Sequence, residues 1–578
     1  MLRKKWEIKN KINQQTAKTY PDMDQVLKQL LFNREIKSKE EINDFLFADY
    51  SKNAHDPFLF RDMEASIDLL IKHIKNQSVI FIYGDYDADG VTSTALLYNL
   101  LSILKAQLKY YIPDRVSEGY GLNMEAIDYM IKEGVCLVVT VDNGIRNKNE
   151  VEYLKKNGVD VIITDHHQAP NTKDEYPDCL TINPAIPEET YPFKYLSGVG
   201  VALKFASALI SKTKLDKSSK NILLDSLFEF SAIGTVADCV SLLGENRLIV
   251  KKGLELLSVS RKPGIVKLVE ISNIKNADKL DAWNIGFQLA PRINAAGRMD
   301  HANTAFKLLI SKNEDEASDL AKKLNHYNQM RQVSSEEIFL EVEKQLDAKD
   351  FLLSAFYNDS SVINEPWNEG IVGLVAGRIT EKYYKPCMVI TKTEEGYKGS
   401  GRSIPEFNIA KALEKNSDYL EKFGGHPLAC GFSLNENNLS MFLEQMERCA
   451  RDELSGKDLC PKIDIDMELS FSQINIELIF KIKKLEPFGQ CNPKPIFVSK
   501  NAVILDKISM GIEGQHLKLV LKQGNSSLIR AIGFGQTEKW KDIKSGDNID
   551  IVYHLDINEF NGKKESQLLI LDILKNAS

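Results

Sequence analysis

Short apolar runs alternate with amphipathic stretches between about residue 78 and residue 183. The apolar runs have the length of buried strands in a parallel sheet, and they cover 79–83, 108–112, 137–141, 161–164 and 180–183. Helical patterns over 124–134 and 149–158 lie between them, and each ends in the glycine that commonly follows a helix. The alternation predicts an α/β domain with a doubly wound parallel sheet.

The pattern changes on both sides of this domain, which we place at 76–250. Residues 1–75 have apolar positions at helical spacing, and we expect them to form a helical N-terminal cap on the sheet domain. Residues 251–350 are expected to be a helical insertion that ends in a long amphipathic helix over 313–347, where glycine and proline are absent. A second α/β domain is expected over 351–455, with strands at 351–357 and 386–391 and a helix at 371–384.

The last segment, 456–578, alternates apolar and polar residues in short runs. These runs cover 462–469, 496–505, 516–522, 527–534, 548–555 and 567–573. Five or six short strands in about 120 residues predict a small β-barrel. Such a barrel can bind single-stranded nucleic acid by stacking bases on aromatic side chains, but a purely structural barrel has the same pattern.

Composition narrows the class of protein only a little. With 578 residues, 43% of them hydrophobic and 27% charged, the chain is typical of a soluble protein with several domains. We find no signal peptide, no apolar run of the ~18 residues that a membrane helix needs, and no CxxC pair among eight cysteines, so we expect a cytoplasmic protein. The net charge of -7 argues against a protein that coats nucleic acid, but it does not exclude a nuclease, whose metal ions and local arginines can attract phosphate.

The stretch after the first apolar run carries the clearest chemistry. Asp85, Asp87 and Asp89 follow the strand 79–83 at alternate positions, and Gly90 leads into a helical run. Open α/β sheets bind ligands at the carboxyl ends of their strands. Two carboxylates about 4 Å apart repel each other by roughly 4 kcal/mol at an effective dielectric of 20, so the cluster indicates half of a metal site. A solvated turn that caps the next helix is the alternative for this stretch alone.

Two further strands end in metal-binding residue types. The run 137–141 leads into Asp142, and the run 161–164 leads into Asp165, His166 and His167. A His-His pair alone is commonly a polar surface feature or part of a core. Because parallel strands end at one edge of a sheet, these residues are expected to meet the aspartates of the first strand, and we predict metal ligation.

These residues carry a family resemblance. The stretches DYDADG (85–90), VDNG (141–144) and TDHH (164–167) resemble the first three motifs of the DHH phosphoesterase superfamily. The stretches SGVGVA (197–202) and GTVADCVSLLGENR (234–247) resemble its RecJ-type single-strand exonuclease branch, and the second of them contains Asp238 as a fourth acidic motif. Similar stretches follow at 290–299, 369–379, 399–404, 423–433 and 485–495. The resemblance implies a DHH domain, a DHH-associated domain over 351–455 and an OB-fold barrel over 456–578.

The candidate ligands favour a hard divalent cation. Carboxylates and imidazole without thiolate select manganese or magnesium over zinc, and the histidine favours manganese. The resemblance implies two such ions, with Mg²⁺ as the alternative to Mn²⁺. It also implies that Asp142 bridges the ions, that His167 contacts the scissile phosphate and that Asp85 supports the site, while the ligands are Asp87, Asp89, Asp142, His166 and Asp238.

Substrate contacts are expected from arginines and from a glycine-rich stretch. The candidates to hold phosphates are Arg292, Arg298, Arg378 and Arg402, and a surface salt bridge is the alternative for each. The GGH stretch, Gly424, Gly425 and His426, is expected to let the backbone approach a ligand, with a simple turn as the alternative. The chain departs from the family pattern at Asn368, where a histidine is usual, and at Cys491, where a glycine is usual.

The resemblance implies a monomeric 5′-to-3′ exonuclease that degrades single-stranded DNA to mononucleotides in recombination and repair, with single-strand binding protein and a helicase as expected partners. Shorter DHH relatives cleave dinucleotides, but they lack the barrel and the helical insertion. A replication scaffold of the same ancestry loses the metal ligands that this sequence retains. An inorganic pyrophosphatase is disfavoured because the GGH stretch does not match that branch.

Overall fold

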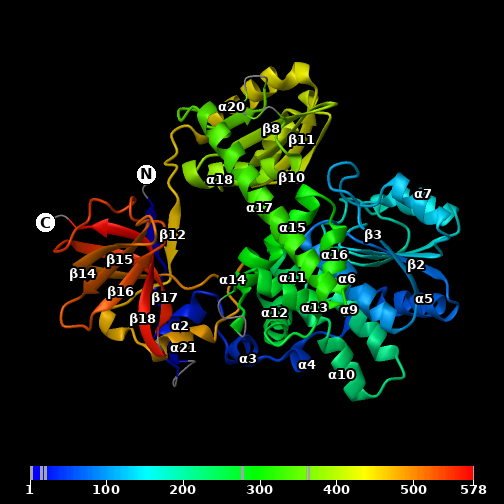
Figure 1. Cartoon of the computed structure of the whole chain (residues 1–578), viewed down its shortest axis with the longest axis horizontal. Coiled ribbons are helices and arrows are strands. Elements are labelled where there is room, and N and C mark those ends of the chain that lie inside the picture. The colour runs from blue at the N-terminus through cyan, green and yellow to red at the C-terminus, as the bar shows by residue number, and fades with distance from the viewer. Residues whose placement is uncertain are drawn as a thin grey trace. The chain divides into compact units, whose positions relative to one another are not determined.

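The computed structural model describes residues 4–13, 17–18, 23–274, 279–358, 361, 363, 365–560 and 562–576. The chain forms two compact units (Figure 1). Unit 1 contains His55–Val240 and Lys252–Pro461, and unit 2 contains Lys4–Ala54, Ser241–Lys251 and Lys462–Ser578. Among the described residues, no helix combines the length and apolar character needed to span a membrane.

The first sheet of unit 1 is parallel throughout, as the strand lengths predict. Its strands lie in the order β3-β2-β4-β5-β6. They are β2 (Val79–Tyr83), β3 (Gln107–Tyr111), β4 (Leu137–Val141), β5 (Asp160–Thr164) and β6 (Leu180–Ile182). The chain passes from β2 to β3 on one side and then to β4 on the other, so the strand order reverses between β2 and β4. Doubly wound sheets bind ligands at this point, outside the carboxyl ends of the strands.

Helices cover both faces of this sheet. On one face, α7 (Met124–Lys132) and α8 (Lys148–Lys156) share a core with side chains of β2, β4 and β5. Helix α6 (Ala88–Ile103) packs against α9 (Gly198–Lys212) and α11 (Phe228–Ala237), and α9 also contacts α5 (Met63–Lys75). Helix α6 begins at Ala88, two residues before the Gly90 that is expected to lead into it, because Asp87 caps it.

The helical region of unit 1 continues from α10 to α17. It contains the predicted long helix as α17 (Glu314–Gln345), which contacts α13, α15, α16 and α18. The remaining elements are α10 (Lys217–Asp225), α12 (Gly244–Leu257), whose first residues belong to unit 2, α13 (Pro263–Ile271), α14 (Ala282–Asn284), the π-helix η4 (Ile285–Leu289), α15 (Ala290–Met299) and α16 (Asn303–Ile310).

A second α/β layer completes unit 1. Its sheet has the order β10-β11-β9-β8-β7, with one parallel pair, β7–β8, and three antiparallel pairs. Helices α17 and α18 form a core on one face, and α19 and α20 form a core on the other. The elements are β7 (Leu353–Phe356), α18 (Glu369–Tyr383), β8 (Cys387–Thr393), β9 (Gly396–Arg402), α19 (Ile409–Lys415), β10 (Lys422–His426), β11 (Ala429–Leu434) and α20 (Leu439–Leu454).

Unit 2 contains the predicted barrel. Five strands lie in the order β14-β15-β16-β18-β17, and β17 pairs with β14 to close the ring. They are β14 (Phe497–Met510), β15 (His516–Lys522), β16 (Ile529–Gly533), β17 (Asn548–Phe560) and β18 (Lys563–Lys575). Next to them lie β12 (Lys462–Ile465), β13 (Met467–Glu468) and α21 (Ile476–Lys483). Short 3-10 turns elsewhere in the chain are Pro57–Leu59, Lys173–Glu175, Ser417–Tyr419, Glu436–Asn438 and Phe471–Gln473.

The N-terminal residues differ from the expected cap on the sheet domain. Strand β1 (Lys5–Ile8) pairs with β12, and α2 (Gln25–Phe32) and α3 (Lys39–Phe47) share one hydrophobic core with the barrel strands. Figure 1 shows α2, in deep blue, next to α21 and the barrel. The short helix α4 (Tyr50–Asn53) belongs to the same unit. Of the described residues up to Lys75, only 55–75 group with the sheet domain. Helical spacing identifies a buried face but not its partner, which here comes from sequence more than 400 residues away.

The expected boundary at residue 250 differs as well, since 241–251 group with the barrel. The side chain of Arg247 donates hydrogen bonds to the carbonyls of Phe45, at 3.0 Å, and Leu485, at 2.8 Å. The amide of Leu242 donates to the carbonyl of Gln490 at 2.9 Å. These bonds attach the segment to unit 2.

Candidate metal and phosphate site

The aspartates after β2 are held by the backbone of two helix starts. Asp87 is the N-cap of α6, and its Oδ1 accepts hydrogen bonds from the amides of Asp89, at 2.9 Å, and Gly90, at 3.0 Å. The carboxylate of Asp89 accepts from the first amides of α9, those of Gly198, at 2.7 Å, and Val199, at 2.9 Å. The α9 helix terminus therefore orients a carboxylate that is 1% exposed.

Asp142 follows β4 directly and adopts a left-handed backbone with a φ of 63°. Aspartate tolerates this conformation better than most residues, and it turns the chain at the end of the strand. The side chain is buried, and α9 passes so close that a Cβ at Gly198 would lie 2.3 Å from Asp142 Oδ1. A glycine at position 198 is therefore needed to leave space for this carboxylate.

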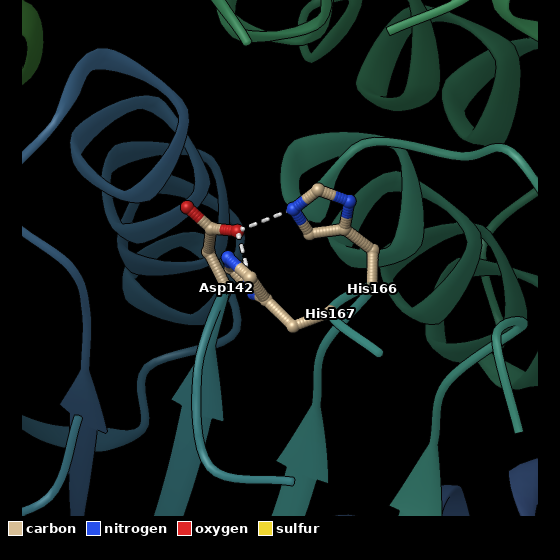
Figure 2. Close-up of side chains that lie close together, drawn as sticks. All are labelled: Asp142, His166 and His167. Carbon is tan, nitrogen blue, oxygen red and sulfur yellow. Dashed lines mark ion pairs between the residues drawn. The ribbon is translucent and has the colours of Figure 1, made fainter. Parts of the chain in front are cut away.

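His166 faces three carboxylates from different elements. Its Nε2 lies 3.1 Å from Asp142 Oδ1, 3.6 Å from Asp238 Oδ2 and 4.0 Å from Asp89 Oδ2. Figure 2 shows the ring and the Asp142 carboxylate pointing toward each other above the ends of the strands. Burial and His167 lower the pKa of His166 to about 4, so the imidazole is neutral at pH 7. No hydrogen bond joins Nε2 to Asp142 Oδ1, and lone pairs facing each other at this distance fit a cation between them.

His167 is held in a different way. Its Nδ1 lies 2.8 Å from Asp165 Oδ1 and 2.9 Å from the hydroxyl of Tyr120. Burial alone would lower the pKa of His167, but the hydrogen bond and charge of Asp165 raise it above the ordinary value. Asp165 in turn accepts hydrogen bonds from the amides of His166, at 2.7 Å, and Ile145, at 3.0 Å. The ring is thus oriented through Nδ1 and can hold a proton on Nε2.

The carboxylates of the site repel one another inside the protein. Burial and the neighbouring aspartates raise the pKa of Asp89 to about 7 and the pKa of Asp238 to about 9. The pKa values of Asp85 and Asp142 are raised for the same two reasons. Water stabilises an ionised carboxylate, but here burial removes water and the neighbouring aspartates add negative charge. A bound cation would compensate for both effects.

The residues present fit divalent cations. Buried atoms of this site that lack a hydrogen bond are Asp85 Oδ1, Asp142 Oδ1, His166 Nε2 and Asp238 Oδ2. The side chains form three overlapping groups whose ligand atoms lie within 4.8 Å of one another: Asp89 with His166 and Asp238, Asp85 with Asp87 and Asp142, and Asp142 with His166 and His167. Asp142 and His166 each belong to two of these groups. Oxygen and imidazole donors suit Mn²⁺ and Mg²⁺.

Arginines gather beside the acidic residues. Arg298, at the end of α15, is half-buried, and this burial together with the nearby Arg115, Arg331 and Arg402 lowers its pKa to about 9, while Asp87 acts in the opposite direction. The guanidinium of Arg115 lies 4.7 Å from the ring centre of Tyr86, inside the DYDADG stretch. We call Arg115, Arg298, Arg331 and Arg402 the arginine cluster. A bound anion would relieve the repulsion among these positive charges, and guanidinium groups bind phosphate particularly well.

The other two candidate arginines lie apart from this cluster. Arg378 pairs with Glu336 at 2.7 Å and lies over the ring of Phe339 at 4.2 Å, so it joins α18 to α17. Arg292 donates to the carbonyl of Gln288 at 2.6 Å and to Asn325 Oδ1 at 3.1 Å. The alternative of a structural salt bridge therefore describes Arg378 well.

The GGH stretch forms the exposed edge strand β10. In the sheet register His426 pairs with Ala429 of β11, which pairs with Arg402 of β9, so His426 and Arg402 lie on one row of the same face. On the neighbouring row Gly424 pairs with Gly431. A Cβ at Gly424 would meet no atom within 4 Å. The strand thus gives a smooth backbone surface beside the arginine cluster.

Several residues of the site carry no signal in the sequence patterns. Tyr120 and Arg115 lie in the loop between β3 and α7, which reads as an ordinary turn. Asp165 is visible in the TDHH stretch, but its role in orienting His167 depends on side-chain geometry.

The two departures from the family pattern have local structural roles. Asn368 is the N-cap of α18, where its Oδ1 accepts a hydrogen bond from the amide of Gly370 at 2.8 Å. Cys491 has a φ of 60°, which explains why glycine is usual there.

The fold and site together define a class of protein. Buried and half-buried aspartates and histidines at the reversal point of a parallel sheet, next to clustered arginines, are the arrangement of a metal-dependent phosphoesterase. Comparison with family models agrees: the DHH family N-terminal domain matches residues 79–235, the DHHA1 domain matches 353–452 and the RecJ OB domain matches 465–572. The chain belongs to the RecJ family of single-stranded-DNA-specific exonucleases.

Relatives match over nearly the whole chain. The RecJ exonuclease of Bacillus subtilis is 37% identical over 94% of this chain and 67% of its own length. That of Salmonella typhimurium is 32% identical over 99% of this chain and 100% of its own length. The crystal structure of Thermus thermophilus RecJ in complex with Mn²⁺ has a TM-score of 0.84 and 26% identity, covering 100% of this chain and 80% of that one. The corresponding Mg²⁺ complex has a TM-score of 0.78.

Proposed function

We propose that this chain is a metal-dependent exonuclease that degrades single-stranded DNA to mononucleotides from the 5′ end, in recombination and repair. The observation that carries the proposal is the set of buried, unpaired ligand atoms around His166 Nε2, which faces carboxylates of three other elements. The polarity rests on the family resemblance.

We assign two divalent ions, Mn²⁺ with Mg²⁺ as the alternative, to the acidic edge of the sheet. Asp89, His166 and Asp238 would hold one ion, and Asp87 and Asp142 would hold the other, with Asp142 reaching both and Asp85 beside it. Bound ions of this kind lower the pKa of water from about 15.7 towards 7 and neutralise charge on phosphate oxygens. Asp89 and Asp142 are presented to them by fixed backbone, so little reorganisation is needed.

His167 is proposed to contact the scissile phosphate. Asp165 and Tyr120 engage its Nδ1, so its Nε2 is the nitrogen left for the substrate. Because Asp165 keeps the pKa of His167 above its ordinary value, the ring can donate a proton or a hydrogen bond from Nε2 to a phosphate oxygen.

The arginine cluster is proposed to bind the phosphate of the strand next to the bond that is cut. Arg298 and Arg402 belong to the two layers of unit 1, so a phosphate there would be contacted from both. Together with the smooth strand β10, the cluster would position one end of a strand, which an exonuclease requires. Single-strand binding protein, a helicase, a monomeric state and a cytoplasmic location remain proposals from the resemblance.

The test is cleavage of oligonucleotides labelled at one end or the other, with duplex DNA and dinucleotides as controls. The proposal predicts release of labelled mononucleotide from the 5′ end first, with Mn²⁺ and on single strands. Binding of strands without cleavage under every divalent ion would indicate a scaffold instead. Turnover of dinucleotides alone would indicate the small-substrate branch of the superfamily.

A further inference from the structure

Two large aromatic side chains are exposed on the segment that precedes α15. Trp283 is 57% exposed and Phe287 is 69% exposed. Their ring centroids lie 5.3 Å apart and their planes differ by 24°, so the rings stack as one surface. We call these two residues the aromatic pair. Two adjacent rings with this exposure indicate a contact surface more than an isolated exposed side chain does.

Phe287 lies on an unusual turn that packs against α11, and Trp283 lies on α14 directly before it. Residues Ile285–Leu289 form a π-helix, a rare element that is frequent at functional sites. A Cβ at Gly286 would lie 3.7 Å from Cγ1 of Val236, so this turn rests against α11. Helix α11 is capped by Asp238, two residues after Val236. The aromatic pair is therefore next to the helix that positions a proposed metal ligand.

The same helical segment leads from the aromatic pair to the arginine cluster. Helices α14, η4 and α15 follow one another without a break from Ala282 to Met299. Arg298 follows Phe287 by eleven positions, which span about 16 Å at a rise of 1.5 Å per residue. At about 3.4 Å per stacked nucleotide this corresponds to about five nucleotides. A strand with one phosphate at Arg298 can thus reach the aromatic pair a few nucleotides away.

Arg292 lies between these two positions on the helix. It donates to the carbonyl of Gln288 and to Asn325, and it is part-buried, so its guanidinium is held in place along the same segment. A fixed cation between an aromatic surface and an arginine cluster matches the alternation of bases and phosphates in a single strand.

We propose that Trp283 and Phe287 stack against bases of the substrate strand, a few nucleotides from the bond that is cut, and that Arg292 contacts the backbone between them. The proposal rests on the proposed function and extends it by giving the strand a path. Stacking suits an exonuclease because every base presents a π-face, so binding does not depend on sequence. Only strands long enough to reach the aromatic pair would gain from it.

The first experiment compares a Trp283→Ala/Phe287→Ala double variant with the wild type on two single-stranded substrates. One is an oligonucleotide of about fifteen nucleotides, and the other is a trinucleotide that is too short to reach the pair. The control is Phe47→Ala, because Phe47 is 67% exposed on α3 and belongs to unit 2, whereas the aromatic pair belongs to unit 1. We expect KM for the long strand to rise between about 5-fold and 100-fold, with kcat and trinucleotide cleavage unchanged.

A second measurement needs no cleavage. Of the four tryptophans, Trp367 is buried, Trp6 and Trp540 are partly buried and Trp283 is exposed. Without divalent ions, single-stranded DNA is expected to quench the fluorescence of the wild type and of Phe47→Ala, and quenching should be lost in Trp283→Phe.

The outcomes separate this proposal from the proposed function. An unchanged KM for the long strand, with the trinucleotide still cleaved, would overturn the stacking role while the nuclease assignment stands. Equal loss on both substrates would also overturn it, because the pair would then act on the catalytic centre. Failure of the wild type to cleave either substrate would contradict the proposed function instead. If Trp283→Phe still binds the strand tightly and shows full quenching, Trp283 does not stack on bases. That result would overturn the proposal and would indicate that the aromatic pair contacts another protein.

Discussion

The acidic edge of the first sheet and the arginine cluster beside it carry opposite charges, but burial and like-charge repulsion shift the pKa values in both. In both, burial and like charges destabilise the ionised side chains: the pKa of Asp238 rises to about 9, and the pKa of Arg298 falls to about 9. The two sets compensate each other only in part: Asp87 raises the pKa of Arg298 and Arg115 lowers that of Asp85, but burial and like charge outweigh both effects. Each therefore fits a ligand of the opposite charge, a cation at one and a phosphate at the other.

Replacing Asp142 by asparagine should have the largest effect. The amide side chain would keep the shape of the carboxylate, and asparagine tolerates the φ of 63°, but the substitution would remove the charge shared by the two proposed ions. We expect cleavage of single-stranded DNA to fall by about 10³-fold or more while strand binding changes little. Single-turnover cleavage and fluorescence anisotropy would measure the two quantities. Parallel loss of binding and of the folded circular dichroism spectrum would show that Asp142 is structural.

Gly198→Ala tests the acidic edge without removing a ligand. The added methyl group would lie 2.3 Å from Asp142 Oδ1 and would displace that carboxylate. Mn²⁺ affinity by calorimetry should fall between about 10-fold and 100-fold. Gly200→Ala in the same helix is the matched control, because its new Cβ would come no closer than 3.3 Å to a neighbour. Equal losses in both variants would point to a general disturbance of α9.

Arg402→Gln tests the cationic side of the comparison. Loss of one guanidinium from the cluster should raise KM for single-stranded DNA between about 10-fold and 100-fold, because charge-assisted bonds to phosphate are strong. Arg378→Gln is the matched control in the same layer, since Arg378 is already paired with Glu336 and should change KM by less than about 2-fold. A larger rise in KM for Arg378→Gln than for Arg402→Gln would indicate that the substrate binds at α18 instead.

The smallest predicted effect is a pH dependence of stability without divalent ions. The pKa of Asp238 is about 9 in the folded chain and near 4 when unfolded, so between these values the folded state binds more protons. In EDTA the Tm should therefore fall by several degrees from pH 7 to pH 9, where His166 is neutral in both states. Mn²⁺ should remove the fall, and Asp238→Asn should reduce it, because the pKa values of Asp85 and Asp142 remain raised. A Tm that rises over this range would contradict the raised pKa.

The sequence predicts the acidic edge better than the cationic one. Parallel strands end at one edge by topology, so the aspartates after β2 and β4 and the histidines after β5 meet whatever the side-chain packing. The arginines depend on how two layers pack, and Arg378 and Arg402 look equivalent in the sequence although one lies in an ion pair and the other in the cluster. Arg115 and Tyr120 come from a loop whose path no periodicity describes.

Dependence on long-range packing also explains why the sequence does not predict the partner of the N-terminal helices. The apolar spacing of this segment predicts helices, and the structure has α2 and α3 there, the latter capped by Ser38. The apolar face of such a helix can pack against many different partners. The partner is fixed by the β1–β12 pairing and by barrel residues such as Phe497, far away in the sequence. Local patterns therefore give the elements, and long-range packing decides which unit they join.

The most direct test of the central claim is anomalous diffraction from crystals soaked with Mn²⁺. We predict two peaks at the acidic edge, one among Asp89, His166 and Asp238 and the other between Asp87 and Asp142, with the Asp142 carboxylate adjacent to both. In crystals of Asp142→Asn we predict loss or weakening of both peaks. Absence of manganese at this edge in the wild type, or two ions bound elsewhere, would contradict the account.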